Sequence, residues 1–350
     1  EHVRIHTFEN GYIVFQGYAG NMFDPASLAA GTKFKFSSLG GYRIDVVRRG
    51  NFHQEDLQAA LQLFTLFSGG AGRQSPLDQL RAMGVQVFLA EESGKYTFDQ
   101  LAGYNAIQQE VEESIILPYR HADHFAAVAR LTRGPEHTNL PRAILLEGPP
   151  GVGKTSLARI IAGQTGLPLV HVPVENIVSK YYGESAQNMA RIFELAGQLD
   201  QVLLFLDEID SLTGSRDDGI VEASRRVLSV LLRKIDGLDL KKGTLTIGAT
   251  NRKQDLDRAL MSRFVQTIAI PLPDAVQRAE IYGLYAPHLN HADRQQLAQL
   301  SEGLAGRNIK DICEFTERRW ARMLLEQKSP PSVPPARIYE EITEAKKMLA

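Results

Sequence analysis

The sequence predicts an α/β protein, in which a parallel sheet flanked by helices carries a C-terminal helical lid and follows a separate small α+β domain. Three patterns support this fold class. Short alternating apolar runs extend to Val46, buried-strand runs and helices alternate from Thr97 onward, and amphipathic helices follow Pro273. We expect an N-terminal accessory domain, a large α/β domain, a helical lid, and a Pro-rich linker with a terminal helix, at residues 1–94, 95–272, 273–328 and 329–350.

The N-terminal domain is expected to combine strands with one helix. Its strand signals are Tyr12–Phe15, Lys33–Phe36 and Tyr42–Val46. Between Leu57 and Phe67 the apolar spacing becomes helical, and the glycine-rich stretch that follows ends that helix. No motif identifies a role for this domain. Contact with a substrate or an adaptor, and simple support of the rest of the chain, both remain open.

The large domain contains four apolar runs that are typical of buried strands. These runs are Arg142–Glu147, Leu167–Val172, Val202–Leu206 and Thr244–Ala249. Amphipathic spacing then predicts the helices of the lid and of the C-terminus. These helices are Ala275–Tyr285, Arg294–Leu300, Asn308–Leu325 and Arg337–Leu349.

Composition argues against several classes of protein. A chain of 350 residues with 43% hydrophobic content can bury a full core. A net charge of −2 argues against bulk electrostatic binding of nucleic acid, and no apolar run approaches the roughly 20 residues of a membrane span. The single cysteine, Cys313, excludes an intramolecular disulfide framework and fits a reducing compartment. We therefore expect a cytoplasmic or organelle-matrix location rather than secretion.

A phosphate-binding motif lies between Gly148 and Thr155. Two glycines bracket four residues and are followed by Lys154 and Thr155, directly after a predicted strand and at the start of a helix. In such a loop the backbone N–H groups surround the phosphates, the lysine neutralises phosphate oxygens, and the hydroxyl suits Mg²⁺. A simple Gly-Pro turn is the alternative, which the register of Lys154 and Thr155 disfavours. The motif predicts a P-loop site for a nucleoside triphosphate and Mg²⁺, and the family resemblance described below implies that the nucleotide is ATP.

Two carboxylates follow the apolar strand Val202–Leu206. Carboxylates at the tip of a buried strand are costly unless they have a role. We expect Asp207 to hold Mg²⁺ and Glu208 to polarise the water that attacks the γ-phosphate. A solvated loop is the alternative, and the phosphate motif upstream in the same predicted sheet weakens it.

These motifs, together with Ala249-Thr-Asn251, resemble the AAA ATPase family, and in particular its protein-remodelling members such as katanin, spastin and the ESCRT-disassembling ATPase. The resemblance extends from Thr97 to about Leu325. It implies that Asn251 helps to orient the attacking water and that Asp236-Gly-Leu238 signals between subunits. The nucleotide-binding residues that it implies are Ala102, Gly103, Tyr104, Pro150, Gly151, Val152, Gly153, Lys154, Thr155 and Ser156.

Ser179–Glu184 resembles the first pore loop of the family, which faces the central channel of a hexameric ring. Tyr181 matches the aromatic residue of that loop, and Lys180 and Tyr182 flank it. An aromatic ring can grip an extended polypeptide through area and shape rather than through sequence. An ordinary loop or core position for the tyrosines is the alternative. The resemblance thus implies a homo-oligomeric ring with a polypeptide substrate in its pore.

Two positions depart from the family pattern. Ser262 stands where close relatives have the first of two arginines, so Arg263 alone is the implied arginine finger, which stabilises charge on the γ-phosphate of the neighbouring subunit. Arg307 stands where many relatives have a small residue. It either reports nucleotide to the lid as a second sensor or is an exposed arginine capped near Asp311.

The sequence therefore predicts an ATP-hydrolysing ring motor that unfolds, translocates or disassembles protein substrates through a central pore. A nucleotide-gated scaffold with little turnover is one alternative, favoured only by Ser262. A nucleic-acid-directed motor is another, and Tyr181-Tyr-Gly183 and the charge balance speak against it. His121 and His124 are not interpreted as a zinc site, because the sequence contains no His-Glu-x-x-His.

Overall fold

A computed structural model gives the structure of the chain in two compact units, Glu1–Ser75 and Pro76–Ala350. The boundary predicted at residue 94 therefore differs from the structural one. The reason is that β5 (Gln86–Phe88) pairs antiparallel with β7 (Leu169–Pro173) and so belongs to the sheet of the second unit. The described residues are 2–7, 13–18, 32–37, 43–48, 53–70, 75–134, 137–175, 177, 185–199, 201–212, 218–235 and 244–349.

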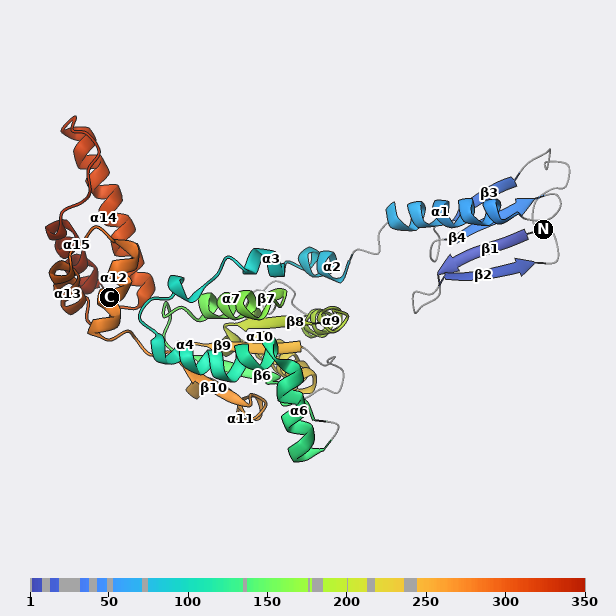
Figure 1. Ribbon diagram of the computed structural model, residues 1–350, viewed down its shortest axis with the longest axis horizontal. Coiled ribbons are helices and arrows are strands. Elements are labelled where there is room, and N and C mark those ends of the chain that lie inside the picture. The colour runs from blue at the N-terminus through green and yellow to red at the C-terminus, as the bar shows by residue number, and fades with distance from the viewer. Residues whose placement is uncertain are drawn as a thin grey trace. The chain divides into compact units, whose positions relative to one another are not determined.

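In its described residues, the first unit is a four-stranded antiparallel sheet and the helix α1 (Figure 1). The strand order is β2-β1-β4-β3, so that two hairpins join through the β1–β4 pair, in which Ile5 lies opposite Ile44. Ile44 and Val46 are buried, as expected of an internal strand. The first of the four strands was not predicted from the sequence. The elements are β1 (His2–Thr7), β2 (Ile13–Tyr18), β3 (Thr32–Ser37), β4 (Arg43–Arg48) and α1 (Gln54–Gly70).

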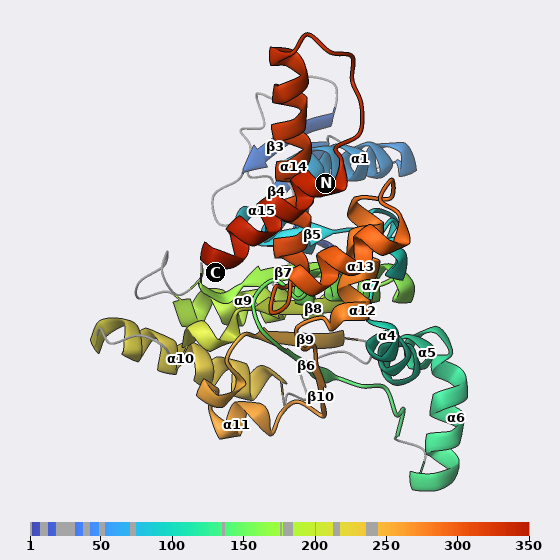
Figure 2. The ribbon, with the colours of Figure 1, turned by 90° about the vertical axis from the view of Figure 1, so that its left-hand side faces the viewer.

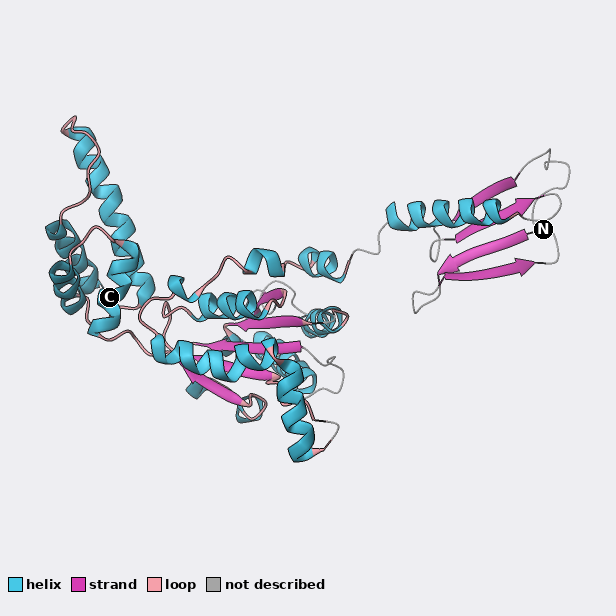
Figure 3. Ribbon diagram, viewed as in Figure 1, coloured by secondary structure: helices cyan, strands magenta, loops and turns pink. Residues whose placement is uncertain are grey.

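The second unit is built on a sheet with helices packed around it (Figure 3). The sheet has six strands, of which only the edge strand β5 runs antiparallel. Its order is β10-β6-β9-β8-β7-β5. The four predicted strands occupy its centre, which confirms the parallel α/β fold class. The two edge strands were not predicted because they are short and carry no long apolar run. The remaining strands are β6 (Ala143–Glu147), β8 (Val202–Asp207), β9 (Thr244–Thr250) and β10 (Gln266–Ala269).

Helices cover both faces of this sheet, with α9 and α10 on one side and α4 and α7 on the other (Figure 2). Alternate residues of β8 feed the two cores: Leu204 lies in the first, whereas Leu203 and Phe205 lie in the second. Burial on both faces explains why these strands are continuous apolar runs. The covering helices are α2 (Pro76–Ala82), α9 (Ser185–Gly197) and α10 (Asp218–Ile235) on one face, and α4 (Asn105–Val111), the π-helical turn Glu112–Ile116 and α7 (Lys154–Thr165) on the other.

Short helices connect the main elements. His121 lies between two of them, at the end of α5. None of the described helices combines the length and the apolar character needed to cross a membrane. The connecting helices are α3 (Ala90–Ser93), α5 (Leu117–Arg120), α6 (Ala122–Arg133) and α11 (Arg258–Met261), with 3-10 turns at Phe98–Gln100, Ile209–Leu212 and Lys253–Asp255.

The lid consists of four helices around a third core. Tyr339 of the last helix is fully buried in that core, so the C-terminal helix is part of the lid rather than a separate appendage. The Asn290 side chain accepts a hydrogen bond from Asp293 N and caps the second lid helix, which starts at His291 rather than at Arg294 as predicted. The helices are α12 (Ala275–Tyr285), α13 (His291–Leu300), α14 (Gly306–Glu326) and α15 (Ala336–Leu349).

Candidate active site

The phosphate-binding motif forms the turn from β6 into α7, which begins at Lys154. Two of its glycines approach other backbone segments closely. A Cβ on Gly148 would lie 2.1 Å from the carbonyl oxygen of Ile270, and Gly151 has φ = +82°, with the Cβ of Arg307 only 3.1 Å from where its own would be. A residue with a side chain would clash or be strained at either position. The loop is therefore held between the sheet and the lid.

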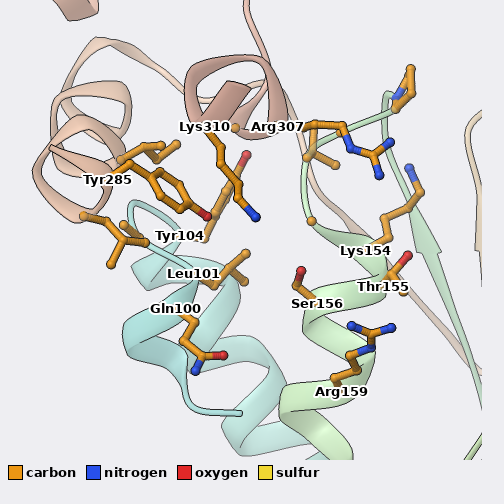
Figure 4. A pocket seen from close by; sticks show the side chains of 18 of the residues that line it. Gln100, Leu101, Tyr104, Lys154, Thr155, Ser156, Arg159, Tyr285, Arg307 and Lys310 are labelled. Atoms are coloured by element: carbon orange, nitrogen blue, oxygen red, sulfur yellow. The ribbon is translucent and has the colours of Figure 1, made fainter. Parts of the chain in front are cut away.

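A cavity of about 510 Å³ lies between this loop, the segment preceding α4, and the lid (Figure 4). This volume is typical of a small-molecule cofactor site. Gly103, which was predicted to contact nucleotide, does not line the cavity and instead packs against Gln277. The predicted site residues that do line it are Ala102, Tyr104, Pro150, Gly151, Val152, Gly153, Lys154, Thr155, Ser156, Asp207, Glu208, Asn251 and Arg307.

The Lys154 side chain is buried and curls back over the loop. Its Nζ donates hydrogen bonds to the carbonyl oxygens of Gly148 (2.6 Å) and Pro149 (3.0 Å) and to Oδ1 of Asn251 (2.7 Å). Burial lowers the pKa of Lys154, and the nearby carboxylates, Asp207 foremost, oppose that shift. A buried ammonium held by uncharged oxygens is well suited to bind an anion.

Thr155 and Asp207 meet at the carboxyl end of β8. The Thr155 hydroxyl donates a hydrogen bond to Oδ2 of Asp207 at 3.0 Å, and Nε2 of His171 lies 3.1 Å from the same oxygen. Burial alone would raise the pKa of Asp207, but hydrogen bonds from His171, Thr155 and the Glu208 backbone outweigh it and hold that pKa below its ordinary value. A hydroxyl and an ionised carboxylate are the hard oxygen ligands that Mg²⁺ prefers, so these residues fit the ion.

Glu208 follows Asp207 in the left-handed region, with φ = +57°, a conformation that costs a non-glycine residue energy. Desolvation, a hydrogen bond with Glu175, and the charges of Asp207, Glu175 and Asp210 raise the pKa of Glu208. Asn251 lies beside it, with its backbone N–H bound to Oδ1 of Asp210 at 3.1 Å. Such backbone strain is typical of functional positions.

A second cavity, of about 430 Å³, shares Pro150, Glu208 and Asn251 with the first. Its other lining residues are mostly charged and carry three further carboxylates. The space beyond Glu208 is therefore acidic and open to a small cation or a cationic side chain. These other lining residues are Glu175, Asp210, Ser211, Arg252 and Asp255.

The lid supplies cavity residues that the sequence analysis missed. Tyr285 of α12 and Lys310 of α14 face each other, with the Lys310 Nζ 5.9 Å from the centre of the Tyr285 ring (Figure 4). Tyr104 lines the cavity near them, and its own burial raises its pKa to about 12. The helical periodicity of α12 and α14 was recognisable, but which faces meet over the cavity depends on the tertiary structure. The other missed lining residues are Gln100, Leu101, Arg159, Ile281, Leu284 and Gly306.

The two predicted arginines occupy different places. Arg307 is exposed in the cavity, and its backbone N–H donates to Gly151 O at 3.0 Å, which joins the lid to the phosphate loop. Asp311, proposed as its alternative partner, lies 3.8 Å from Lys346. Arg263 does not line the cavity, and its Nη1 donates to Oγ of Ser262 at 3.1 Å.

Two groups of predicted residues lie outside the described part of the chain. They are the pore-loop residues Lys180, Tyr181 and Tyr182, and the signalling segment Asp236–Leu238.

Comparison with known proteins agrees with this geometry. The sequence profile of the ATPase family associated with various cellular activities (AAA) matches residues 144–272. The "Mitochondrial sorting homolog" of Caenorhabditis elegans is 30% identical over 267 residues, which cover 75% of this chain and 75% of that protein. The chain belongs to the AAA family. The family is one of ATPases by its description.

Other relatives of this AAA ATPase extend the comparison. The "Proteasome-activating nucleotidase" of Methanocaldococcus jannaschii is 33% identical over 241 residues, 67% of this chain and 54% of that protein. The chain thus matches only about half the length of that relative. The AAA domain of FIGL-1 superimposes with a TM-score of 0.63 at 23% identity, covering 79% of this chain and 91% of that domain, which shows a shared fold.

Proposed function

We propose that the chain is a subunit of an ATP-driven ring, homo-oligomeric and hexameric, that remodels protein substrates by drawing them through a central pore. The observation that carries the proposal is the cavity between phosphate loop and lid, in which Lys154, Thr155, Asp207, Glu208 and Asn251 converge. Because the lid supplies one wall, nucleotide occupancy can move the lid relative to the sheet. That motion is what a ring needs to convert hydrolysis into work on a substrate.

In the proposed reaction, Lys154 leaves its loop carbonyls and binds the β- and γ-phosphates. Thr155 and Asp207 hold Mg²⁺, which when bound neutralises phosphate oxygens. Glu208 accepts a proton from the attacking water, and Asn251 orients that water. Tyr285 and Tyr104 provide aromatic surface for the base of the nucleotide.

The ring assembly is supported by the acidic second cavity. Its carboxylates lie beside Glu208 and suit a cationic side chain from a neighbouring copy, for which Arg263 is the candidate. Arg263 lines neither cavity of its own subunit, and its Nη1 donates to Oγ of Ser262, which leaves the residue available to a neighbouring copy in the proposed ring. We also propose that Arg307 reports the nucleotide to the lid, since it lies in the cavity on α14.

Protein as the substrate rests on the Tyr181 loop and on the name of the proteasome-activating relative. A cytoplasmic or organelle-matrix location and an adaptor at the first unit are further parts of the proposal. A nucleotide-gated scaffold with little turnover is the second candidate, and the single arginine beside Ser262 is the observation that favours it.

Steady-state ATPase activity with and without an unfolded model protein tests the proposal. We expect unfolded protein to change the turnover of the intact chain, and Tyr181→Ala to abolish that response while basal hydrolysis persists. Glu208→Gln serves as the hydrolysis-dead control. An intact protein that hydrolyses ATP but whose turnover ignores polypeptide would contradict direct translocation and favour the scaffold.

A further inference from the structure

Two polar side chains on neighbouring strands, Gln86 and His171, form a row behind Asp207, the carboxylate of the proposed magnesium site. Gln86 of β5 lies directly opposite His171 of β7 in the strand register. His171 in turn lies opposite Phe205, two residues before Asp207 on β8. Residues two apart on a strand share one face of the sheet, so His171 and Asp207 are diagonal neighbours on the face covered by α7.

The contacts along this row are specific. Nε2 of His171 donates to Oδ2 of Asp207 at 3.1 Å, and its Nδ1 lies 3.2 Å from Oε1 of Gln86. The centroid of the imidazole ring lies 5.1 Å from that of Phe205, at an interplanar angle of 38°. The His171 side chain is only 12% exposed and that of Asp207 18%. Both ring nitrogens and one ring face are thus engaged, which fixes the orientation of the imidazole.

Asp207 is held from two directions at one atom. The hydrogen bonds from His171 and from the Thr155 hydroxyl both go to Oδ2, and neither uses Oδ1. A hydroxyl that donates its hydrogen to a carboxylate keeps its lone pairs for a metal ion. The position of this carboxylate therefore depends on His171 as well as on the phosphate loop.

We propose that His171 is a positioning residue for the magnesium site, holding Asp207 in place, and that the edge strand β5 supports it through Gln86. The inference rests on the magnesium site proposed above. Groups that orient metal ligands from behind commonly change metal affinity about 10–100-fold when they are removed. It also gives the segment just after the first unit a direct link to the nucleotide site, because β5 begins only ten residues after Pro76.

A purely structural role for His171 makes a different prediction. Loss of packing at β7 would weaken nucleotide binding whether or not metal is present. Loss of a positioning contact acts only on the metal-dependent part of binding. The comparison of nucleotide affinity in Mg²⁺ with that in EDTA therefore separates the two roles.

The experiment is equilibrium binding of a fluorescent, non-hydrolysable ATP analogue to the full chain, titrated with Mg²⁺ and repeated in EDTA. His171→Phe keeps an aromatic ring against Phe205 and removes both nitrogens, whereas His171→Gln keeps an N–H donor. Gln86→Leu removes the outer support at an exposed position. His288→Phe is the matched control, because His288 also contacts one ring, that of Tyr339, and lies 3.2 Å from a carbonyl oxygen, but in the lid.

We expect His171→Phe to raise the half-saturating Mg²⁺ concentration about tenfold or more. His171→Gln should recover most of this loss, Gln86→Leu should raise the concentration about two- to threefold, and His288→Phe should leave it unchanged. Affinity in EDTA should be the same for all of these proteins. An unchanged Mg²⁺ requirement in His171→Phe, or an equal loss in EDTA, overturns the proposal.

Two further outcomes are decisive. If His171→Phe does not fold, an unchanged Mg²⁺ requirement in Gln86→Leu overturns the proposal, and a raised one supports it. If the unmodified chain binds the analogue equally well in Mg²⁺ and in EDTA, the magnesium site itself fails and the role of His171 fails with it.

Discussion

Replacement of Arg278 by methionine should strongly destabilise the lid. Arg278 is only 6% exposed, and its Nε and Nη1 donate to the carbonyl oxygens of Ala298 (2.7 Å) and Pro273 (2.6 Å). One buried cation thus ties α12 to the end of α13 and to the strand-to-lid connection. Arg278→Met leaves two buried carbonyl groups without these donors, and each lost hydrogen bond costs about 1–3 kcal/mol of stability. Removal of the buried charge offsets part of that cost, because the charge no longer has to be taken out of water on folding. We expect a net loss of about 3 kcal/mol.

Urea unfolding followed by the fluorescence of Trp320 measures this loss, because the single tryptophan lies on α14 in the lid. Arg294→Met is the matched control, since Arg294 donates to the Pro287 carbonyl at 2.7 Å from a more exposed position, and it should cost about 1 kcal/mol or less. Nucleotide affinity should fall with Arg278→Met, because α12 carries Tyr285. A loss in Arg278→Met no larger than in Arg294→Met would refute the reasoning.

Three further predictions follow. A Cβ at Gly163 of α7 would lie 2.2 Å from the carbonyl oxygen of Ser93 in α3. Gly163→Ala should therefore lower the free energy of unfolding, measured in urea, by about 1–3 kcal/mol, although alanine has a higher helix propensity than glycine. A variant more stable than the intact chain would contradict this close contact between α3 and α7. Cys313 is 1% exposed and burial raises its pKa to about 12, so a thiol reagent should label it only on unfolding. Because the folded state retains the thiol proton above the ordinary cysteine pKa of about 8.5, the free energy of unfolding measured in urea should fall as the pH rises from about 8.5 toward about 12. Rapid labelling of the native protein would contradict this burial. Glu208→Gln should bind ATP and assemble, detectable by light scattering, and a monomer at about micromolar protein would count against ATP-driven assembly.

Much of the candidate site follows from local spacing in the sequence. The phosphate loop, the carboxylates after Val202–Leu206 and Asn251 each follow a strongly apolar strand. The carboxyl ends of parallel strands share one edge of a sheet, so recognising the strands already brings Lys154, Asp207 and Asn251 together. In the structure these three side chains converge on one cavity. The fold class was also predictable, because buried strands and amphipathic helices can be recognised from the periodicity of their apolar residues.

The remaining features depend on contacts between distant segments. β5 has three residues and gains its place only by pairing with β7, so the boundary at residue 94 was drawn too late in the chain. His171 is a polar residue inside an apolar strand, a signal that was visible, but its partner Asp207 is defined only by strand register.

By itself, the sequence determined the chemistry of the nucleotide loop, the central strands and the helical character of the lid. Only the tertiary structure decided that Tyr285 and Lys310 complete the cavity and that α15 belongs to the lid core. The physical reason is that periodicity fixes which face of an element is apolar, whereas the partner of that face depends on how the elements pack.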